Sequence, residues 1–440
     1  MKIDVTKQLR KRIGANFIVN ISGTFVTFLI NVILARISGV EYYGQYVYVL
    51  SWVSLLVLVS KFGLDTTSLR FIPKYVSEEN YPSLRGYRKK SSHILMVVSI
   101  SVAVVSSLAV FLISKNIDKS LRYTFYISFI LLPLQSYLIL RGSYLQAFHF
   151  SALNQFLQIL FKPILIGMVG LLYWLVNTQD VLPYVAMLIN VLATIISILF
   201  SVYFFKKYIP RYFFSGKEEY KTLTWIKNAA PLLLVTSFTM IINQTDIIML
   251  GMIEGTKEAG IYAVTTRICG FITFAMIITN AVAAPMISQL HTQDKFSELQ
   301  KIISISAWGS GVFGLGVTLF LMFFGVYVLG IFGEEYKSAS NLLILIAVGK
   351  MVLAISGTSG YLMSMSGHSK QAAKVMGFST IINIVLNYIF INTYGIEGAA
   401  IATLITTFIW CGVMVILVRK YLNINSTIFV NILTLRGESI

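Results

Sequence analysis

Long apolar segments separated by short polar ones run along almost the whole chain. Examples are Ile94 to Ile113, Leu182 to Phe205 and Ile396 to Val418. Each supplies roughly the 20 apolar residues that a helix needs to cross about 30 Å of hydrocarbon. The pattern predicts an all-α integral membrane protein with about twelve transmembrane helices. The expected spans are Ile13–Ile37, Tyr42–Leu64, Ser92–Ser114, Leu121–Ala147, Ala152–Val176, Val181–Phe205, Lys227–Ile253, Gly260–Gln289, Ile302–Phe332, Ser338–Ser366, Ala372–Thr393 and Ile396–Val418.

Composition supports the membrane assignment. The 440 residues are 56% hydrophobic and only 12% charged, with a mean hydropathy of +0.77. Such a chain cannot hide its apolar surface in a water-soluble core and needs lipid as its solvent. The two cysteines, Cys269 and Cys411, lie in apolar runs, where a thiol behaves as a small hydrophobe. We therefore expect no disulfide and no redox role.

The positive charge is distributed unevenly between the loops. When loops are assigned alternately to the two sides, about 24 Lys and Arg fall on the side of the N-terminus and about 6 on the other. This predicts a multi-pass protein of the cell (plasma or inner) membrane with both termini in the cytoplasm. The net charge of +17 then reflects topology and anionic lipid headgroups rather than a nucleic-acid partner.

The chain divides into two similar halves. A basic loop, Lys206 to Lys221, separates six expected spans from six, which predicts an N-terminal lobe (1–205), a cytoplasmic linker (206–226) and a C-terminal lobe with a short cytoplasmic tail (227–440). The pattern Gly-x4-Gly-x-Tyr occurs at Gly39 to Tyr46 and again 216 residues later at Gly255 to Tyr262. Glycines there suit a tight turn with positive φ or a close helix approach. Six spans return the chain to its starting side, so we expect a parallel repeat.

A polar stripe follows the first span of each half. At 100° per residue, the members of each stripe fall within about 80° of one another. The stripes consist of Asn16, Asn20, Thr24, Thr27 and Asn31, and of Asn228, Thr236, Thr239, Asn243 and Asp246. They could form hydrogen bonds between packed helices. We favour the other interpretation, a hydrated cavity between the lobes lined by residues such as Asn20, Thr27, Asn31 and Asn243.

Five basic residues lie inside expected spans: Lys61, Arg141, Lys162, Arg267 and Lys350. Each costs about 2.5–3.5 kcal/mol at a helix centre on the insertion scale. Among the acids, Asp246 is clearly intramembrane and Asp65 stands at a span end. The cations outnumber these partners, so the surplus predicts an anionic substrate, with Lys162, Arg267 and Lys350 as the strongest candidates. Lys61 and Arg141 could instead snorkel to the interface. Asp246 and Asp65 are candidate ion-coupling residues.

We find no pattern typical of an enzyme. The four histidines stand alone, without Cys, His or carboxylate at metal-ligand spacing, and no phosphate-cradling loop of the Gly-x4-Gly-Lys type occurs. The sequence therefore predicts neither a catalytic residue nor a metal site nor a cofactor.

Three motifs resemble a known family. Phe62 to Phe71, Gly39 to Tyr46 and Tyr394 to Thr403 resemble the polysaccharide-transport flippases, the Wzx-like (O-antigen and capsule repeat-unit) branch of the multidrug/oligosaccharidyl-lipid/polysaccharide exporter superfamily. The resemblance implies two six-helix lobes around a central cationic cavity. It also implies movement of undecaprenyl-diphosphate-linked oligosaccharides from the inner to the outer leaflet, with polysaccharide polymerase machinery as a candidate partner.

The residues fit this function independently of the resemblance. A diphosphate needs Lys or Arg, a sugar needs amide and hydroxyl groups, and a polyprenyl tail can stay in lipid. Alternatives are a cation-coupled multidrug exporter, which would want an acidic cavity, and a lipid II flippase, for which the resemblance implies fourteen spans. A polysaccharide polymerase or glycosyltransferase should carry a larger loop, and a purely structural scaffold leaves the buried cations unexplained.

Overall fold

The computed structural model describes residues 5–113, 115, 117–293 and 295–428. The side chains of 5–13, 15, 227–236, 281–282, 284–285, 288–289 and 291–292 lie outside this description. The described chain is helical and contains no strand, which confirms the all-α prediction. It divides into two compact units, Met1–Ser237 and Phe238–Ile440, which we describe separately.

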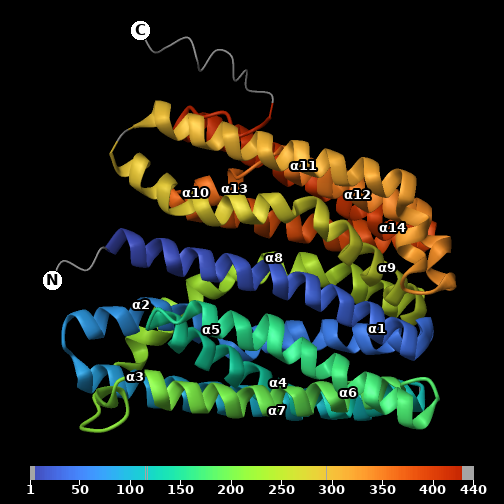
Figure 1. Cartoon of the computed structure of the whole chain (residues 1–440), viewed down its shortest axis with the longest axis horizontal. Helices are drawn as coiled ribbons and strands as arrows, with labels where there is room; N and C mark the ends of the chain where they lie inside the picture. Colours follow the sequence, from blue (N-terminus) through green and yellow to red (C-terminus); the bar gives the residue numbers. More distant parts are fainter. Residues whose placement is uncertain (1–4, 114, 116, 294, 429–440) are drawn as a thin grey trace. The chain divides into compact units, whose positions relative to one another are not determined.

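Unit 1 contains the first seven α-helices and the start of the eighth (Figure 1). Within it α4 packs against α1, α2, α3 and α7, and α1 also packs against α6. The helices are α1 (Val5–Lys61), α2 (Leu64–Ser77), α3 (Tyr81–Leu112), α4 (Lys119–Ala147), α5 (Ser151–Gln155), the π-helix η2 (Phe156–Phe161), α6 (Lys162–Asn177), α7 (Pro183–Tyr208), the short 3-10 helix η3 (Arg211–Phe213) and α8 (Thr222–Ile253).

Helix α1 consists of two helices joined at Gly39. A straight helix of its 57 residues would be about 85 Å long at 1.5 Å per residue, far more than a bilayer spans. At Gly39 the backbone has φ 71° and ψ 167°, which breaks the helix. Gly255, its counterpart in the repeat, has φ 112°. The predicted glycine turns with positive φ are therefore confirmed at both positions.

An aromatic core fills one end of unit 1. Tyr87, Tyr144, Phe205, Phe213 and Trp225 are buried and belong to one cluster. The cluster joins α2, α3 and α4 to the end of α7, η3 and the first turn of α8. Helix α3 accordingly begins at Tyr81, well before the expected span start at Ser92, because its first turns pack on this core rather than ending at the membrane surface.

Unit 2 holds the end of α8 and the remaining helices, several of which are interrupted. Gly357 (φ 65°) separates α12 from α13 within one expected span, and Gly395 (φ 59°) divides α14 into two helices. The elements are α9 (Thr256–Cys269), η4 (Gly270–Thr273), α10 (Phe274–Thr292), α11 (Phe296–Gly330), η5 (Glu334–Ala339), α12 (Ser340–Ile355), α13 (Ser359–Met365) and α14 (Ser369–Leu422).

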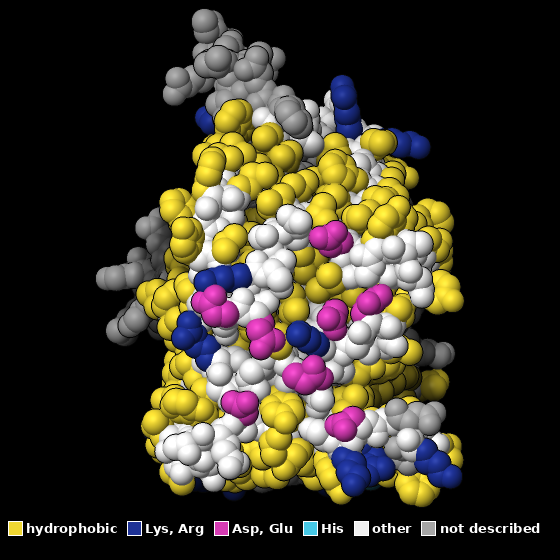
Figure 2. Space-filling view, turned by 90° about the vertical axis from the view of Figure 1, so that its right-hand side faces the viewer, with side chains coloured by type: hydrophobic (Ala, Val, Ile, Leu, Met, Phe, Trp, Pro, Cys, Tyr) yellow, Lys and Arg dark blue, Asp and Glu magenta, His cyan; other side chains and the backbone are white. Residues whose placement is uncertain are grey.

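Among the described residues, nine helical segments are long and apolar enough to cross a membrane. The two longest, Asn16–Ser77 and Ser369–Leu422, are broken at Gly39 and Gly395, and Ser237–Ile253 is a shorter apolar helix. Figure 2 shows one face of the molecule, on which Asp and Glu side chains gather. The chain turns at Gly39 in unit 1 and at Gly255 in unit 2. Exposed Glu41 and Glu254 lie beside these turns. The multi-pass membrane architecture is clear, while the count of twelve and the parallel repeat stay predictions.

Candidate functional site

Lys61, the first of the five predicted intramembrane cations, forms an ion pair with a nearby carboxylate. Its Nζ lies 2.6 Å from Asp65 Oδ2, and both side chains are mostly buried. Between them Phe62 (φ 48°) and Gly63 (φ 70°) turn the chain from α1 into α2. This reversal brings the Lys and Asp together, so the charge of Lys61 is balanced within unit 1.

Arg141 is held by aromatic side chains. It donates a hydrogen bond of 2.5 Å to the hydroxyl of Tyr137, one turn earlier on α4. Its guanidinium carbon lies 4.4 Å from the ring centroid of Phe205 on α7. A cation over a ring face is stabilised by the ring quadrupole. The charge of Arg141 is therefore stabilised within unit 1 by the Tyr137 hydroxyl and the Phe205 ring.

Lys162 differs, because its ammonium group is buried against a neutral partner. Its relative exposure is 9%, and Nζ donates a hydrogen bond of 2.6 Å to Gln135 Oε1 on α4. No carboxylate of the described residues forms an ion pair with it. A buried ammonium without an anion is costly. Lys162 is thus the clearest uncompensated cation of unit 1.

The local backbone explains how Lys162 is placed. The carbonyl of Ile159 would normally accept a hydrogen bond from residue 163, but this is Pro163, which has no N–H. The chain forms the π-helix η2 immediately before α6, and Thr27 Oγ1 on α1 donates to the Ile159 carbonyl at 3.0 Å. Gly23, one turn before Thr27, leaves room for Ile159 because a Cβ there would lie 2.6 Å from Ile159 Cγ2. π-Helical turns are frequent at functional sites.

The polar stripe of α1 faces the fifth expected span. Asn16 Nδ2 donates to Ser151 Oγ at 2.8 Å, and Asn20 Nδ2 donates to Gln155 Oε1 at 2.8 Å. Asn31 accepts a hydrogen bond of 3.1 Å from Tyr43. These residues therefore connect helices inside unit 1, and their role as cavity lining stays a prediction.

Asp246 of α8 is the centre of the strongest polar cluster in unit 2. Its carboxylate is 5% exposed. It accepts hydrogen bonds from Tyr262 Oη of α9 at 2.5 Å, from Asn387 Nδ2 of α14 at 2.9 Å and from Thr403 Oγ1 of α14 at 2.8 and 2.9 Å. Three neutral donors thus hold one buried negative charge. We call Asp246, Tyr262, Asn383, Asn387 and Thr403 the Asp246 cluster.

Two amide oxygens of the cluster have no partner. Asn383 Nδ2 donates to Thr403 Oγ1 at 3.1 Å, while Asn387 Nδ2 is used on Asp246. Both side chains are 0% exposed, and their Oδ1 atoms accept no hydrogen bond from the described residues. Buried polar atoms are nearly always satisfied. Carboxylate, amide and hydroxyl oxygens in one buried cluster are the donor set of a hard cation.

The repeat gives unit 1 an uncharged counterpart of this cluster. Tyr262 corresponds to Tyr46 at the offset of 216 residues, and Asp246 corresponds to the position just before Asn31. In unit 1, Tyr46 Oη accepts a hydrogen bond of 2.9 Å from Asn190 Nδ2. A tyrosine and an amide therefore lie together in unit 1 as well, at the position that corresponds to Tyr262.

The other two predicted cations also lie in unit 2. Arg267 is half-buried in the last turn of α9, and Lys350 lies near the middle of α12. Lys350 interacts electrostatically with Asp246 without a direct ion pair. Asn243 of the second stripe is exposed, while Asn228 and Thr236 lie outside the described side chains. Whether these residues face a cavity between the lobes stays a prediction.

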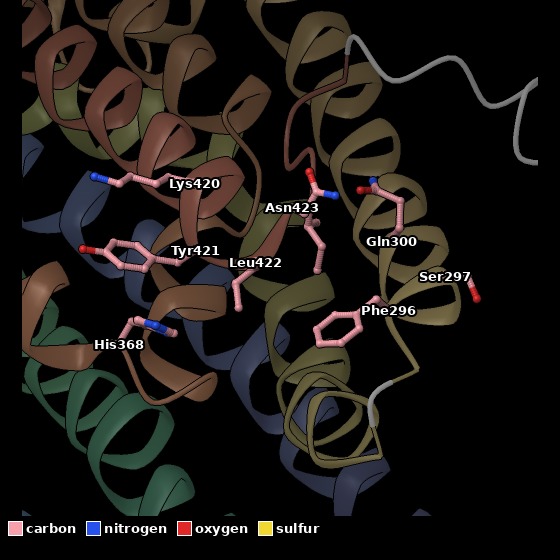
Figure 3. Close-up of a pocket in the computed structure, with 9 residues that line it drawn as sticks. Phe296, Ser297, Gln300, His368, Lys420, Tyr421, Leu422 and Asn423 are labelled. Carbon is pink, nitrogen blue, oxygen red and sulfur yellow. The ribbon is translucent and has the colours of Figure 1, made fainter.

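A cleft of about 510 Å³ opens at the end of unit 2 where α11 begins and α14 ends. Figure 3 shows Gln300 and Asn423 on one side of it and His368 with Tyr421 on the other. The ring centroids of His368 and Tyr421 lie 4.8 Å apart, with the ring planes tilted by 34°. No predicted site residue lines this cleft.

Sequence reasoning missed the residues that surround the candidates. Gln135 beside Lys162 was not predicted, because the expected spans do not indicate which helix faces which. Asn383 and Asn387 stand four residues apart in the eleventh expected span. That spacing places two amides on one helix face and was the available signal. Thr403 ends the quoted motif Tyr394 to Thr403, but nothing in the sequence paired it with Asp246.

Helices of this length, interrupted at glycines and enclosing buried charges, define a multi-span membrane protein. The family model described as "Polysaccharide biosynthesis protein" matches residues 9–291, and the model described as MatE matches 231–389. Because the first match covers more than half of the chain, the protein belongs to the polysaccharide biosynthesis protein family. The two matches together place it in the multidrug/oligosaccharidyl-lipid/polysaccharide exporter superfamily.

Relatives and solved structures agree with this assignment. The chain is 27% identical over 162 residues to the probable low-salt glycan biosynthesis flippase Agl15 of Haloferax volcanii, covering 36% of this chain and 34% of that protein. It is 25% identical over 207 residues to a putative O-antigen transporter of Salmonella typhi, covering 46% and 47%. An uncharacterized membrane protein of Methanocaldococcus jannaschii, MJ1068, is 22% identical over 413 residues, covering 87% and 78%. The matched part is thus less than half of either named transporter.

The fold is shared with transporters of known structure. An inward-facing multidrug resistance MATE family transporter of the MOP superfamily superposes with a TM-score of 0.72 at 14% identity, over 96% of this chain and 99% of that chain. The lipid II flippase MurJ in an inward closed conformation gives a TM-score of 0.69 at 16% identity, over 92% and 87%. The predicted fold class is therefore confirmed.

Proposed function

We propose that this protein is a flippase that moves undecaprenyl-diphosphate-linked oligosaccharide repeat units from the inner to the outer leaflet by alternating access. The observation that carries the proposal is Lys162, a buried ammonium whose hydrogen-bond partner is the neutral Gln135. A cation with a neutral partner stabilises a bound anion more than an ion-paired cation does. When it binds the anion, no protein carboxylate loses its counter-charge. Lys162, Arg267 and Lys350 bind the diphosphate, and the ion-paired Lys61 and the ring-bound Arg141 contribute less.

The relatives support the same substrate class. Flippases of glycan biosynthesis and a putative O-antigen transporter are among the proteins that this chain matches. The buried cations also oppose the multidrug alternative, because an exporter of organic cations would need acidic side chains there. A lipid II flippase remains the second candidate, since the fold of MurJ is shared and its substrate offers a diphosphate as well.

The driving force is an ion that binds the Asp246 cluster. Asp246 is the better candidate for ion coupling than Asp65, because Lys61 already occupies Asp65. The unpartnered oxygens of Asn383 and Asn387 favour a cation such as Na⁺ over a proton on Asp246. An inside-negative membrane potential adds about 2.3 kcal/mol per 100 mV for each negative charge moved outward. The protein works in the cell membrane with both termini in the cytoplasm, and polysaccharide polymerase machinery is a candidate receiver of the flipped lipid.

Flipping of a lipid-linked oligosaccharide by purified protein in liposomes tests the proposal. Loss of one charge-assisted hydrogen bond costs about 1.5–3 kcal/mol, so Lys162→Gln should weaken binding roughly 10- to 150-fold. Lys162→Arg keeps the charge and should be affected less. Lys89→Gln, which removes an exposed charge from a surface ion pair of unit 1, serves as the control. Full flipping by Lys162→Gln, at matched insertion and thermal stability, would contradict the proposal.

A further inference from the structure

Helix α12 packs against the same elements that hold Asp246. Gly349 faces α14: a Cβ there would make an ordinary van der Waals contact with Leu404 Cδ1 at 3.6 Å, and Leu404 is the neighbour of Thr403. On its other side, α12 receives a hydrogen bond from Cys269 Sγ of α9 to the Leu343 carbonyl at 3.5 Å. Helices α9 and α14 supply Tyr262, Asn387 and Thr403 to the carboxylate. Lys350, the residue after Gly349, therefore lies on a helix that packs against both α9 and α14, the helices that supply these donors.

The ammonium of Lys350 is unusual in having no fixed partner. Within the described part of the chain, it donates no hydrogen bond and forms no ion pair, and its side chain is half-buried. It nevertheless interacts electrostatically with Asp246. Asp246 in turn is satisfied by neutral donors rather than by this cation. The buried Asp246 and the half-buried Lys350 thus carry opposite charges and interact without direct contact.

This arrangement suits an exchange of counter-ions. Lysine carries its charge on a flexible four-carbon stem, so the ammonium can move toward or away from Asp246 without a change in the backbone. A cation bound at Asp246 neutralises the carboxylate and repels the ammonium. An empty site attracts it. The charge of Lys350 is then available to an anion only while the cation site is filled.

We propose that Lys350 is a tethered counter-ion that couples the two sites: it balances Asp246 when no cation is bound, and it is released to bind the substrate diphosphate when Na⁺ occupies the Asp246 cluster. The proposal rests on the proposed function, and it adds the link between ion and substrate. By linkage, Na⁺ must raise the affinity for the diphosphate by the same factor by which the diphosphate raises the affinity for Na⁺.

Equilibrium binding to the full-length protein tests the exchange, with ²²Na⁺ and undecaprenyl diphosphate as probes in detergent. In the wild type, Na⁺ should tighten diphosphate binding by about 5- to 150-fold, the usual range of coupling between two sites. Lys350→Gln removes the competing charge, so it should bind Na⁺ more tightly without lipid, by up to the same factor, and its diphosphate affinity should no longer respond to Na⁺. Asp246→Asn should bind the diphosphate without Na⁺ as tightly as the wild type does with it.

Two further variants separate charge from structure. Lys350→Arg keeps the charge and should retain part of the coupling. Lys337→Gln removes a cation of the same unit that forms a surface ion pair with Glu334, and it should leave both affinities unchanged. An unchanged or weaker Na⁺ affinity in Lys350→Gln would overturn the exchange, as would a loss of diphosphate affinity at every Na⁺ concentration. Absence of diphosphate binding in the wild type, with Na⁺ binding tightened in Lys350→Gln, would instead overturn the proposed substrate.

Discussion

Trp225 and Tyr75 join two segments that are 150 residues apart in the sequence: the indole Nε1 donates a hydrogen bond of 2.9 Å to the tyrosine Oη. Trp225 is 2% exposed and packs edge-on against Tyr87 at 5.2 Å. The first turn of α8, the helix that continues into unit 2, is thereby fixed to α2 and α3 of unit 1. The connection between the halves therefore starts from an anchored residue.

This bond should be measurable as a coupling. Trp225→Phe removes the donor and Tyr75→Phe removes the acceptor, and each should lower the free energy of unfolding by about 1 kcal/mol plus any lost packing. The two effects should not add, because both changes remove the same bond. Thermal unfolding of the two single variants and the double variant in detergent checks this. Additive losses would show that the bond contributes nothing.

The loop that precedes α8 is docked on α3 by charged groups. Arg85 donates to the carbonyls of Lys217 at 2.8 Å and of Ser215 at 2.9 Å. Ser83 Oγ donates to Glu219 Oε2 at 2.6 Å, and the Glu219 amide donates to the Pro82 carbonyl at 3.0 Å. The hydrogen bond from Ser83, followed by that from Lys221, lowers the pKa of the Glu219 carboxyl from its ordinary value of 4.5.

Docking of this loop should therefore depend on pH. A carboxyl whose pKa is lowered by folding stabilises the folded state at every pH above its ordinary pKa of 4.5. This stabilisation is lost as the pH falls below about 4.5 toward the lower pKa of the folded state. Hydrogen exchange of the amides of residues 215–221, corrected for intrinsic rates, should show protection falling over this window. In Ser83→Ala the folded pKa of Glu219 lies closer to its ordinary value, so the fall in protection should be smaller and should be complete at a higher pH. Unchanged protection down to pH 3 would refute the role of Glu219.

The fold was largely predictable, because apolar segment length and the Gly-x4-Gly-x-Tyr repeat depend on local sequence alone. The helix breaks at Gly39 and Gly255 belong to this class. The π-helix before Lys162 belongs to it only in part: Pro163 is visible in the sequence, whereas the Thr27 hydroxyl that reaches the Ile159 carbonyl comes from another helix. The Asp246 cluster was half predictable for the same reason. Its charge is visible in the sequence, whereas its partners Asn387 and Thr403 come from helices that only packing brings together.

The π-helix yields a prediction about Thr27. Thr27→Val removes the hydroxyl that donates to the carbonyl of the half-buried Ile159, and the net contribution of such a hydrogen bond to stability is about 0.5–1.5 kcal/mol. We expect lower thermal stability and, because Lys162 follows η2, weaker Lys162-dependent diphosphate binding. Thr27→Ser retains the hydroxyl and should behave like the wild type. Equal effects of the two substitutions would point to packing of the methyl group instead.

Charge asymmetry predicts the orientation in the membrane. The loop containing Lys206, Lys207 and Lys217 should be cytoplasmic, and the turns beside Glu41 and Glu254 should be external. Alkaline phosphatase, which is active only outside the cytoplasm, should be inactive when fused after Lys217 and active when inserted at Gly255. The reverse pattern, with both fusions intact, would overturn the topology.

Substitution by alanine should have opposite effects on stability at two helical glycines, Gly86 and Gly309. At Gly86 of α3, a Cβ would collide with the backbone of Glu219, and backbone cannot move aside as a flexible side chain can. At Gly309 of α11, a Cβ would have nothing within 4 Å. Alanine is the better helix former by about 1 kcal/mol, so Gly309→Ala should be neutral or stabilising, whereas Gly86→Ala should displace the docked loop and destabilise unit 1. Thermal unfolding and hydrogen exchange of residues 215–221 measure both consequences. Unchanged protection of the loop in Gly86→Ala would show that the loop does not approach α3 this closely. Destabilisation by Gly309→Ala as well would show that the loss of stability is common to helical glycines and is not caused by this contact.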